Sequence, residues 1–232
     1  MVRLSDIALA PLHAAQMLGV IARVPRLPEA AGARAGSCGQ GQALRLLVLG
    51  DSSAAGVGVA HQDQALVGQI CVHLGRMHHL DWQLCARSGA TTAGALRLLA
   101  AARAPVDVVV LALGVNDVLR QTPLRRFAAG QAALIDQLRA EYGARLILAS
   151  AVPPLGAFEV FPMPLRAHLG RRADALDAEL QRVCAARDGV VHVPFDLDPA
   201  PHWLAADGLH PGAALYAEWG QRMAGLASRG VS

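Results

Sequence analysis

The chain has 232 residues, enough for one packed domain and short for two, and its apolar share of 53% excludes an intrinsically disordered chain. Aromatic residues make up only 4%, too few for the stacking platforms of proteins that bind single-stranded nucleic acid. The formal net charge is +3, but the chain has no lysine and its arginines are scattered, so we expect no nucleic-acid partner.

Residues 1–42 differ in composition from the rest of the chain and form a separate N-terminal segment. Pro11 suits the first turn of a helix, and apolar residues at helical spacing after it share one face: Leu12, Ala15, Leu18 and Ala22. We expect a short helix that docks on the domain surface. A lid or a membrane-surface helix is the alternative, but the segment lacks an Arg-rich polar face. The Gly-, Ala- and Ser-rich stretch from Ala30 to Gln42 predicts a flexible connection.

The sequence indicates a cytoplasmic protein. No apolar run reaches the ~20 residues that span a bilayer, and the apolar-rich stretch from Ile7 to Ile21 is interrupted by a proline and polar residues. This makes it a poor core for a signal peptide. The four cysteines form no Cys-x-x-Cys pair, which predicts reduced thiols and not a zinc site or a disulfide framework: Cys38, Cys71, Cys85 and Cys184.

A regular alternation of strands and helices begins at residue 43 and predicts one domain over residues 43–232. Five short apolar runs are the predicted strands: Leu44–Leu49, Trp82–Ala86, Val106–Leu113, Leu146–Val152 and Val190–Phe195. Five segments have helical spacing: Gln64–His79, Thr92–Arg103, Pro123–Tyr142, Leu165–Arg187 and Pro211–Ser228. Four of the runs are almost continuously apolar, as in strands covered on both faces. We therefore predict an α/β fold, a three-layer α/β/α sandwich with a flavodoxin-like, doubly wound, five-stranded parallel sheet.

The first predicted strand is followed by a glycine-rich turn that contains Ser52. Ligands of open α/β sheets bind beyond the carboxyl ends of the strands, so a serine here could be presented to a ligand. A phosphate loop is excluded because no Gly-Lys-Ser/Thr follows, and a dinucleotide fingerprint because the glycines at 50, 56 and 58 have the wrong spacing. The α/β-hydrolase elbow G-x-S-x-G is missed by one position, at Ala54. Taken alone, the turn could be an ordinary glycine-rich loop.

Two further strand ends carry residues that could line the same crevice. Gly89 follows the second strand and could aim its backbone N–H into a site, although a simple turn glycine is the alternative. Asn116 follows the third strand and could donate its side-chain amide to a developing oxyanion. The alternative for Asn116 is a turn that bonds its own backbone.

Near the C-terminus, Asp207 and His210 lie three residues apart in a short loop. A carboxylate beside an imidazole can fix its tautomer and stabilise its charged form. Metal binding with His202 as a further ligand is a weaker alternative, because no fourth ligand or clear spacing is present.

These blocks, in this order and spacing, resemble the GDSL-type or SGNH hydrolases. The family is named for the Ser, Gly, Asn and His that stand here at Ser52, Gly89, Asn116 and His210, and the resemblance spans roughly residues 43–228. One departure is Ser53, which replaces the leucine or isoleucine that often follows the nucleophile. Two adjacent hydroxyls result, and Ser52 occupies the motif position.

The resemblance implies a serine esterase or lipase with Ser52 as nucleophile, His210 as base and Asp207 as the orienting carboxylate. It also implies an oxyanion hole made by the backbone N–H groups of Ser52 and Gly89 and the side chain of Asn116. The reaction would pass through an acyl-enzyme and need no cofactor or metal. The substrate would be a small-molecule ester, of short to medium acyl chain, or a thioester.

The sequence leaves the substrate open. The apolar, proline-rich stretch after the fourth strand could form a wall for an acyl chain: Phe158, Phe161, Met163 and Leu165. An ordinary loop over the domain is an equal alternative. A thioesterase, a lysophospholipase or a carbohydrate acetylesterase could use the same catalytic residues. A non-catalytic acyl-binding module and a nucleotide-binding flavodoxin-like protein are less compatible with the full set of motif residues.

Overall fold

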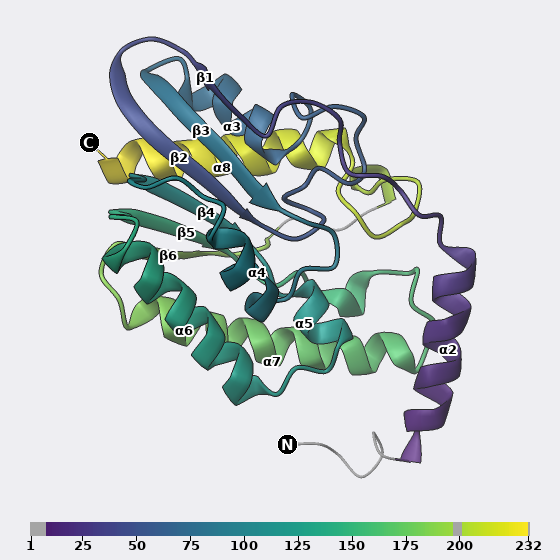
Figure 1. Ribbon diagram of the computed structural model, residues 1–232. Coiled ribbons are helices and arrows are strands. Elements are labelled where there is room, and N and C mark those ends of the chain that lie inside the picture. Colours follow the sequence, from purple (N-terminus) through teal and green to yellow (C-terminus); the bar gives the residue numbers. More distant parts are fainter. Residues whose placement is uncertain (1–7, 197–200, 232) are drawn as a thin grey trace.

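A six-stranded, mostly parallel sheet organises the computed structural model, which describes residues 8–196 and 201–231 (Figure 1). The strands are β1 (Ala35–Cys38), β2 (Gln42–Gly50), β3 (His78–Ala86), β4 (Val108–Ala112), β5 (Leu146–Ser150) and β6 (Val190–Val193). Their order across the sheet is β1-β3-β2-β4-β5-β6; β2 to β6 run parallel, and β1 runs antiparallel to β3. Each of the five predicted strands is therefore present.

The expectation of five strands must be corrected, because β1 lies within the stretch predicted to be a flexible connection. Its sequence, Ala-Gly-Ser-Cys, has no apolar run that would predict a strand. The segment is ordered by pairing with the edge of β3, from Ala35 opposite Gln83 to Cys38 opposite Leu80. A Cβ atom on Gly36 would lie 3.1 Å from the Trp82 ring, so the small residue lets β1 pass close to β3.

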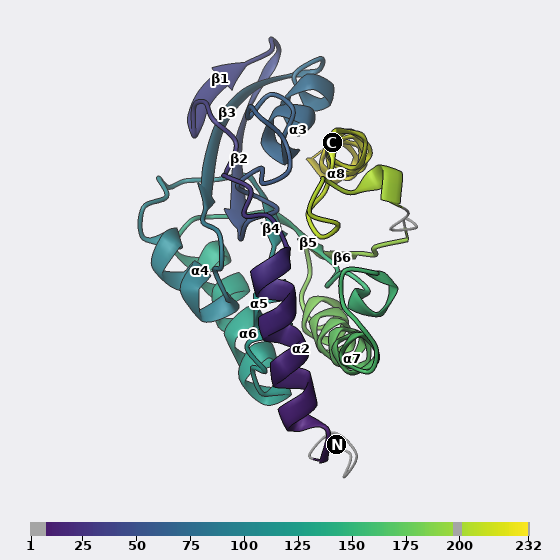
Figure 2. The same cartoon turned by 90° about the vertical axis from the view of Figure 1, so that its right-hand side faces the viewer.

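The sheet is covered on both faces, as its continuously apolar strands predict (Figure 2). Along β2, Leu47 and Leu49 point to one buried cluster, and Leu46 and Val48 point to the other. The first cluster is closed by α4 (Thr92–Leu99), α6 (Leu124–Ala140) and α7 (Leu165–Ala185), and the second by α3 (Leu66–Leu74) and α8 (Ala213–Val231). Short helices complete the described chain: α5 (Val115–Leu119), η1 (Leu155–Ala157) and η2 (Pro201–Trp203).

The N-terminal helix α2 (Ala10–Arg23) lies beyond the carboxyl ends of β2 and β3 (Figures 1 and 2). The apolar face predicted for it is turned outward: Leu12 is 44% exposed and Leu18 is 68% exposed. His13 is buried, and Met17 and Val20 pack against the first core cluster. The helix therefore docks through the face opposite to the predicted one. Among the helices of residues 8–196 and 201–231, none is long and apolar enough to cross a bilayer.

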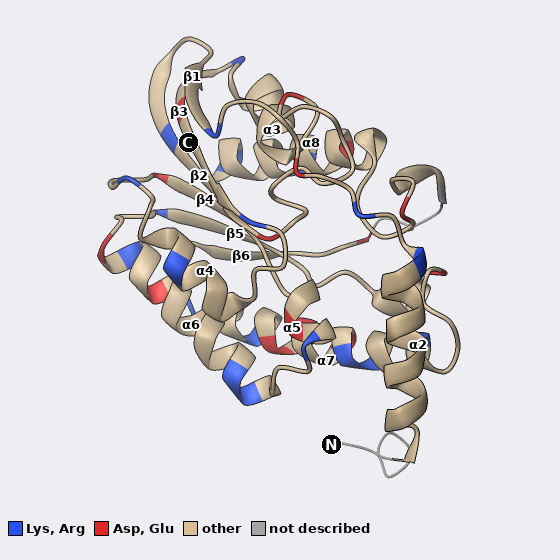
Figure 3. Cartoon of the chain, turned by 45° about the vertical axis from the view of Figure 1, so that its right-hand side comes forward, with Lys and Arg blue, Asp and Glu red and all other residues tan. Residues whose placement is uncertain are grey.

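In the view of Figure 3, residues of both charge signs are spread over the helices and loops. The arginines visible there do not gather in one stripe, in line with their scattered positions in the sequence.

Candidate active site

The turn after β2 presents Ser52 because the end of this strand is pressed against β4. A Cβ atom on Gly50 would lie 2.4 Å from the Ala112 carbonyl oxygen, so only glycine fits there. The chain then makes one helical turn, in which the N–H of Ala55 donates to the Asp51 carbonyl and that of Val57 to the Ser52 carbonyl. Ser52 is left half-buried at the carboxyl end of the sheet.

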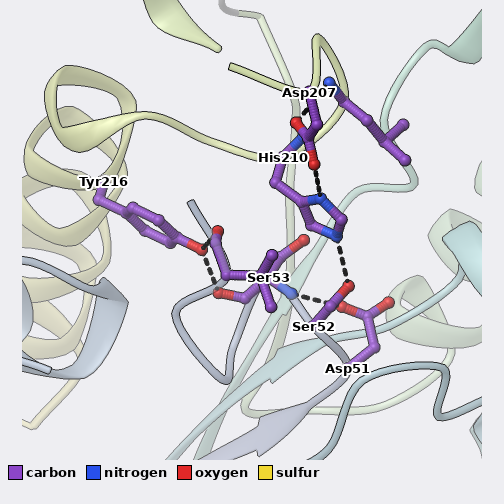
Figure 4. Close-up of polar contacts among 8 residues, drawn as sticks. Asp51, Ser52, Ser53, Asp207, His210 and Tyr216 are labelled. Atoms are coloured by element: carbon purple, nitrogen blue, oxygen red, sulfur yellow. Dashed lines mark hydrogen bonds and ion pairs between the residues drawn. The ribbon is translucent and has the colours of Figure 1, made fainter. Parts of the chain in front are cut away.

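The buried Tyr216 of α8 fastens this turn from the opposite side (Figure 4). Its hydroxyl lies 2.9 Å from the carbonyl oxygen of Ser53 and 2.8 Å from that of Val57, and donates to both. Burial, with the nearby Asp51 and Asp207 carboxylates, raises the pKa of Tyr216 well above its ordinary value. The hydroxyl therefore stays protonated, as a donor to two carbonyls must.

Ser52, His210 and Asp207 form a hydrogen-bonded chain (Figure 4). The Ser52 Oγ lies 2.9 Å from Nε2 of His210, and Nδ1 of His210 lies 2.5 Å from Oδ2 of Asp207. The neighbouring Ser53 contacts Asp51, since its backbone N–H donates to Oδ1 of Asp51 at 3.0 Å. The structure thus brings the three predicted catalytic residues together, with Ser52 in contact with the imidazole.

The loop that carries His210 is folded around the Asp207 carboxylate. The backbone N–H groups of Leu209 and His210 both donate to Asp207 Oδ1 at 3.0 Å, which leaves Oδ2 for the imidazole. Burial of Asp207 opposes its ionisation, but the hydrogen bonds from His210 and Leu209 outweigh this and lower its pKa. Asp207 is therefore an anion that can orient the ring and stabilise it when protonated.

A second buried carboxylate, Asp51, lies directly beside the serine. One of its oxygens accepts from the N–H of Ser53 and the other from Nδ2 of Asn116 at 3.2 Å. Burial raises the pKa of Asp51 to about 6, although these hydrogen bonds and the charge of His210 oppose the rise. Sequence reasoning assigned no role to Asp51, because its partner Asn116 is 65 residues away.

Asn116 lies in the first turn of α5, not in a loop, and its amide points toward the serine turn. Its Nδ2 donates to Asp51 Oδ2 and, at 3.1 Å, to the carbonyl oxygen of Ala90. The next residue, Asp117, is buried and accepts from both the backbone N–H and the hydroxyl of Thr92 at the start of α4. These contacts hold the β4–α5 turn against the loop that contains Gly89.

Gly89 has a φ of 78°, the left-handed region that favours glycine. The preceding residue is tied to the N-terminal segment, since the N–H of Ser88 donates to Glu29 Oε1 at 2.6 Å. The other oxygen of Glu29 pairs with Arg34 at 3.0 Å, and Arg34 also donates to the carbonyl of Ala86. The Gly89 loop is therefore braced by residues that precede the sheet.

A cavity of about 490 Å³ opens at this edge of the sheet, and Ser52, Gly89, Asn116 and His210 all line it. Phe158 and Phe161, two of the residues predicted to contact an acyl chain, also line it, whereas Met163 and Leu165 are not among its lining residues. Met163 is 57% exposed beside two prolines, and Leu165 begins α7 with its side chain in the core.

A family model confirms the resemblance found in the sequence. The model of the GDSL-like lipase/acylhydrolase family matches residues 48–218, about three quarters of the chain. The chain belongs to this family. As a GDSL-like hydrolase it is a carboxylic ester hydrolase, and this agrees with the chemistry that a Ser-His-Asp arrangement can perform.

Solved structures match this GDSL-like hydrolase over most of its length. TesA is 26% identical, with a TM-score of 0.65 over 81% of this chain and 99% of TesA. The psychrotrophic esterase EstA from Pseudoalteromonas sp. is 20% identical, with a TM-score of 0.59 over 80% of this chain and 96% of its own. A carbohydrate acetylesterase from Sinorhizobium meliloti is also 20% identical, with a TM-score of 0.59 over 80% and 99%. A search of curated proteins finds no match.

The sequence left open a metal site with His202 as one ligand, and such a site needs several ligand side chains grouped together. Within residues 8–196 and 201–231, no three His, Cys, Asp or Glu side chains are grouped so that they could hold a metal ion. His202 packs against the ring of Trp203, with ring centroids 5.3 Å apart. In this GDSL-like hydrolase, His210 is oriented by Asp207 instead.

Proposed function

We propose that the chain hydrolyses carboxylic esters of short to medium acyl chain length through an acyl-enzyme formed on Ser52. The observation that carries the proposal is the continuous hydrogen-bond chain from Ser52 through His210 to the buried Asp207. A serine hydroxyl is a poor nucleophile until a neighbouring base takes its proton, and this chain provides that base.

In the proposed acylation, Oγ of Ser52 attacks the ester carbonyl while Nε2 of His210 takes the hydroxyl proton. His210 then passes this proton to the alcohol oxygen as the carbon–oxygen bond breaks, and Asp207 stabilises the imidazolium in between. In deacylation, His210 takes a proton from water, the resulting hydroxide attacks the acyl carbon, and the proton returns to Ser52. Besides the ester and water, these steps use only side chains and backbone groups of the chain.

The negative charge on the tetrahedral oxygen would be stabilised by the N–H groups of Ser52 and Gly89 and by the amide of Asn116. The position of Gly89 and Asn116 on the cavity wall supports this assignment. The Asn116 amide also donates to Asp51 and Ala90, so one of its hydrogens would be shared with the oxyanion in a three-centre bond. Such preorganised donors contribute most where water is excluded.

The apolar wall of the cavity favours esters with an aliphatic chain over acetylated sugars. Phe158 and Phe161 are buried, and neither carries a hydrogen-bonding group for a sugar hydroxyl. A thioesterase or lysophospholipase would share these catalytic residues and this wall, and a substrate panel separates these activities.

Replacement of Ser52 tests the proposal, because Ser52→Ala removes the nucleophile and leaves the rest of the cavity in place. We expect kcat for p-nitrophenyl butyrate to fall by at least about 10⁴-fold. Labelling of the wild-type protein by a fluorophosphonate should occur at Ser52 and disappear in the variant.

Ser53→Ala is the matched control, since it removes the adjacent hydroxyl and retains the backbone N–H that donates a hydrogen bond to Asp51. It should keep most of the activity and all of the labelling. Loss of labelling in Ser53→Ala alone, or full turnover by Ser52→Ala, would show that the nucleophile is misassigned.

A further inference from the structure

We infer that the N-terminal helix α2 forms one wall of the substrate cavity and binds the aliphatic chain of the ester. This inference rests on the proposed function, and it defines the substrate class as esters with a chain longer than acetyl. The family model begins at residue 48, so α2 lies outside the part of the chain that the family match covers.

The residues of α2 that line the cavity recur at helical spacing. Met17, Val20 and Ile21 line it from one face of the helix, and Val24, directly after α2, lines it as well. Phe158, Leu155 and Leu119, from the chain after β5 and β4, line the same cavity. The cavity therefore has aliphatic and aromatic surface on the α2 side as well as on the domain side, and Ser52 and His210 are part of its lining.

Gln16 fixes α2 to the body of the domain. Its side-chain Nε2 donates to the carbonyl of Met163 at 2.7 Å, and its Oε1 accepts from the N–H of Leu165 at 3.1 Å. A side chain that pairs with both a donor and an acceptor of the backbone holds the helix in one rotation. Met17 and Val20 are thus directed to the cavity while Leu18 faces outward.

The segment after α2 is tied to the nucleophile turn. The N–H of Ala30 donates to the Ala55 carbonyl, and the buried Gln62 donates from Nε2 to the carbonyls of both Ala30 and Ala55. The helix is therefore held near its middle by Gln16 on the start of α7, and the segment that follows it is held by Ala30 on the Ser52 turn. It is a fixed part of the cavity wall.

The composition of α2 matches an apolar ligand. Between Ala10 and Ala22 the helix has no charged residue, and its only arginine is Arg23 in the last turn (Figure 3). A wall that bound a sugar or a phosphate would need donors and acceptors here, whereas an alkyl chain needs only apolar surface. Each buried methylene would raise kcat/KM about fourfold.

A matched pair of serine substitutions on α2 tests the inference. Ile21 is 53% exposed but lines the cavity, and Leu18 is 68% exposed and is not part of the lining, so neither change should unfold the protein. The readout is the kcat/KM for p-nitrophenyl octanoate divided by that for p-nitrophenyl acetate. We expect Ile21→Ser to lower this ratio about five- to tenfold, and Leu18→Ser to leave it at the wild-type value.

A second series places the alkyl chain in the alcohol, with octyl acetate compared with ethyl acetate. A lower octyl ratio in Ile21→Ser would show that the alcohol part contacts α2, and a lower octanoate ratio would show that the acyl part does. A lower ratio in either series supports the inference. Unchanged ratios in both series, or equal losses in Ile21→Ser and Leu18→Ser, would overturn it.

Val20→Trp provides an independent measurement, because a larger side chain at this lining position should fill part of the cavity. The octanoate ratio should then fall about tenfold or more, as judged from the methylenes that lose contact. If this variant does not fold, the Ile21→Ser result stands alone as the test.

Failure of the inference can be told apart from failure of the proposed function. A fluorophosphonate labels Ser52 in every α2 variant if the serine is the nucleophile, whatever the chain-length ratio. Normal labelling with unchanged ratios would refute the α2 wall only. Absence of labelling in the wild-type protein would refute the proposed function and, with it, this inference.

Discussion

Asp51 is a buried carboxyl group beside the nucleophile, and it affects both the geometry of the site and the stability of the fold. Asp51 aligns the Ser53 backbone and the Asn116 amide through its two oxygens. Burial also raises its pKa to about 6, so its charged form is costly in the folded protein. The folded state therefore binds the Asp51 proton more tightly than the unfolded state does, and stability is lost as pH rises from about 4 to about 6.

Replacement by asparagine should remove this pH dependence. In Asp51→Asn, the free energy of unfolding should lose the decline between pH 4 and pH 6, which amounts to at most about 3 kcal/mol in the wild type. Urea unfolding at pH 4.5, 5.5 and 7 measures the effect. Parallel profiles for the two proteins would contradict the raised pKa of Asp51.

The same variant should lose activity even where it gains stability. An asparagine can still accept from Ser53, but its amide nitrogen then faces the amide nitrogen of Asn116, and two donors cannot pair. We expect kcat to fall roughly tenfold or more with KM little changed, because the change acts on an oxyanion donor.

At the scale of elements, the segment between α2 and β1 links the N-terminal helix to the Gly89 loop. Glu29 accepts from the Ser88 N–H with one oxygen and from Arg34 with the other. Glu29 touches no reacting atom, so it is a positioning residue for the neighbouring Gly89. The segment thus contributes both to the cavity wall and to the geometry of the proposed oxyanion hole.

Glu29→Gln should therefore affect turnover more than stability. The side-chain amide of the glutamine would turn a hydrogen-bond donor toward Arg34, which is itself a donor, and the contacts that hold the Gly89 loop would weaken. We expect kcat to fall about five- to tenfold with little change in KM. The loss of stability should stay below about 1 kcal/mol, since the pair with Arg34 is partly exposed. Glu141→Gln, at the exposed residue directly after α6, is the control and should leave kcat unchanged. Equal kcat values in all three proteins would show that the brace has no part in turnover.

The sequence predicts elements well where burial imposes a pattern and poorly where pairing alone orders the chain. The central strands are apolar on both faces, so their runs are visible in the sequence. In contrast, β1 is held by the edge of β3 and has no pattern of its own. The docking face of α2 was assigned from leucine and alanine, whereas the helix packs through His13, Met17 and Val20.

The same distinction applies to the site. Ser52, Asp207 and His210 were predicted because they stand in motifs at strand or loop ends, and the structure brings them into contact. Glu29 and Ser88 are 59 residues apart, and no local pattern links such a pair. Phe158 and Met163 have similar apolar character in the sequence, and only the packing of the loop separates the one that lines the cavity from the one that does not.

At the scale of the whole molecule, the active site and the ionic contacts of Asp107 lie at opposite ends of the sheet. Asp107, just before β4, accepts from the backbone and guanidinium of Arg45 and from Arg145. These hydrogen bonds outweigh its burial and lower the pKa of Asp107 to about 2. The site lies beyond the carboxyl ends of the same strands, as is general for open α/β sheets.

Asp107→Asn should therefore lower stability and leave catalysis alone. A depressed carboxyl pKa stabilises the folded state above pH 4, and this contribution is lost as pH falls toward 2. After allowance for screening by solvent, we expect a loss of about 1 kcal/mol at pH 7 that shrinks near pH 2. Denaturant unfolding at the two pH values measures it, with kcat/KM expected at the wild-type value. A loss of equal size at both pH values would argue against an ionic origin.

The separation of Ser52 and His210 by 158 residues has a consequence for synthesis. The ribosome makes the nucleophile first and its base only after the last strand of the described sheet, β6. A chain that stops before residue 210 carries the serine without the imidazole that activates it. Copies that end between Ser52 and His210 should thus be inert toward esters, and the order of the two residues keeps the serine inactive until its base has been made.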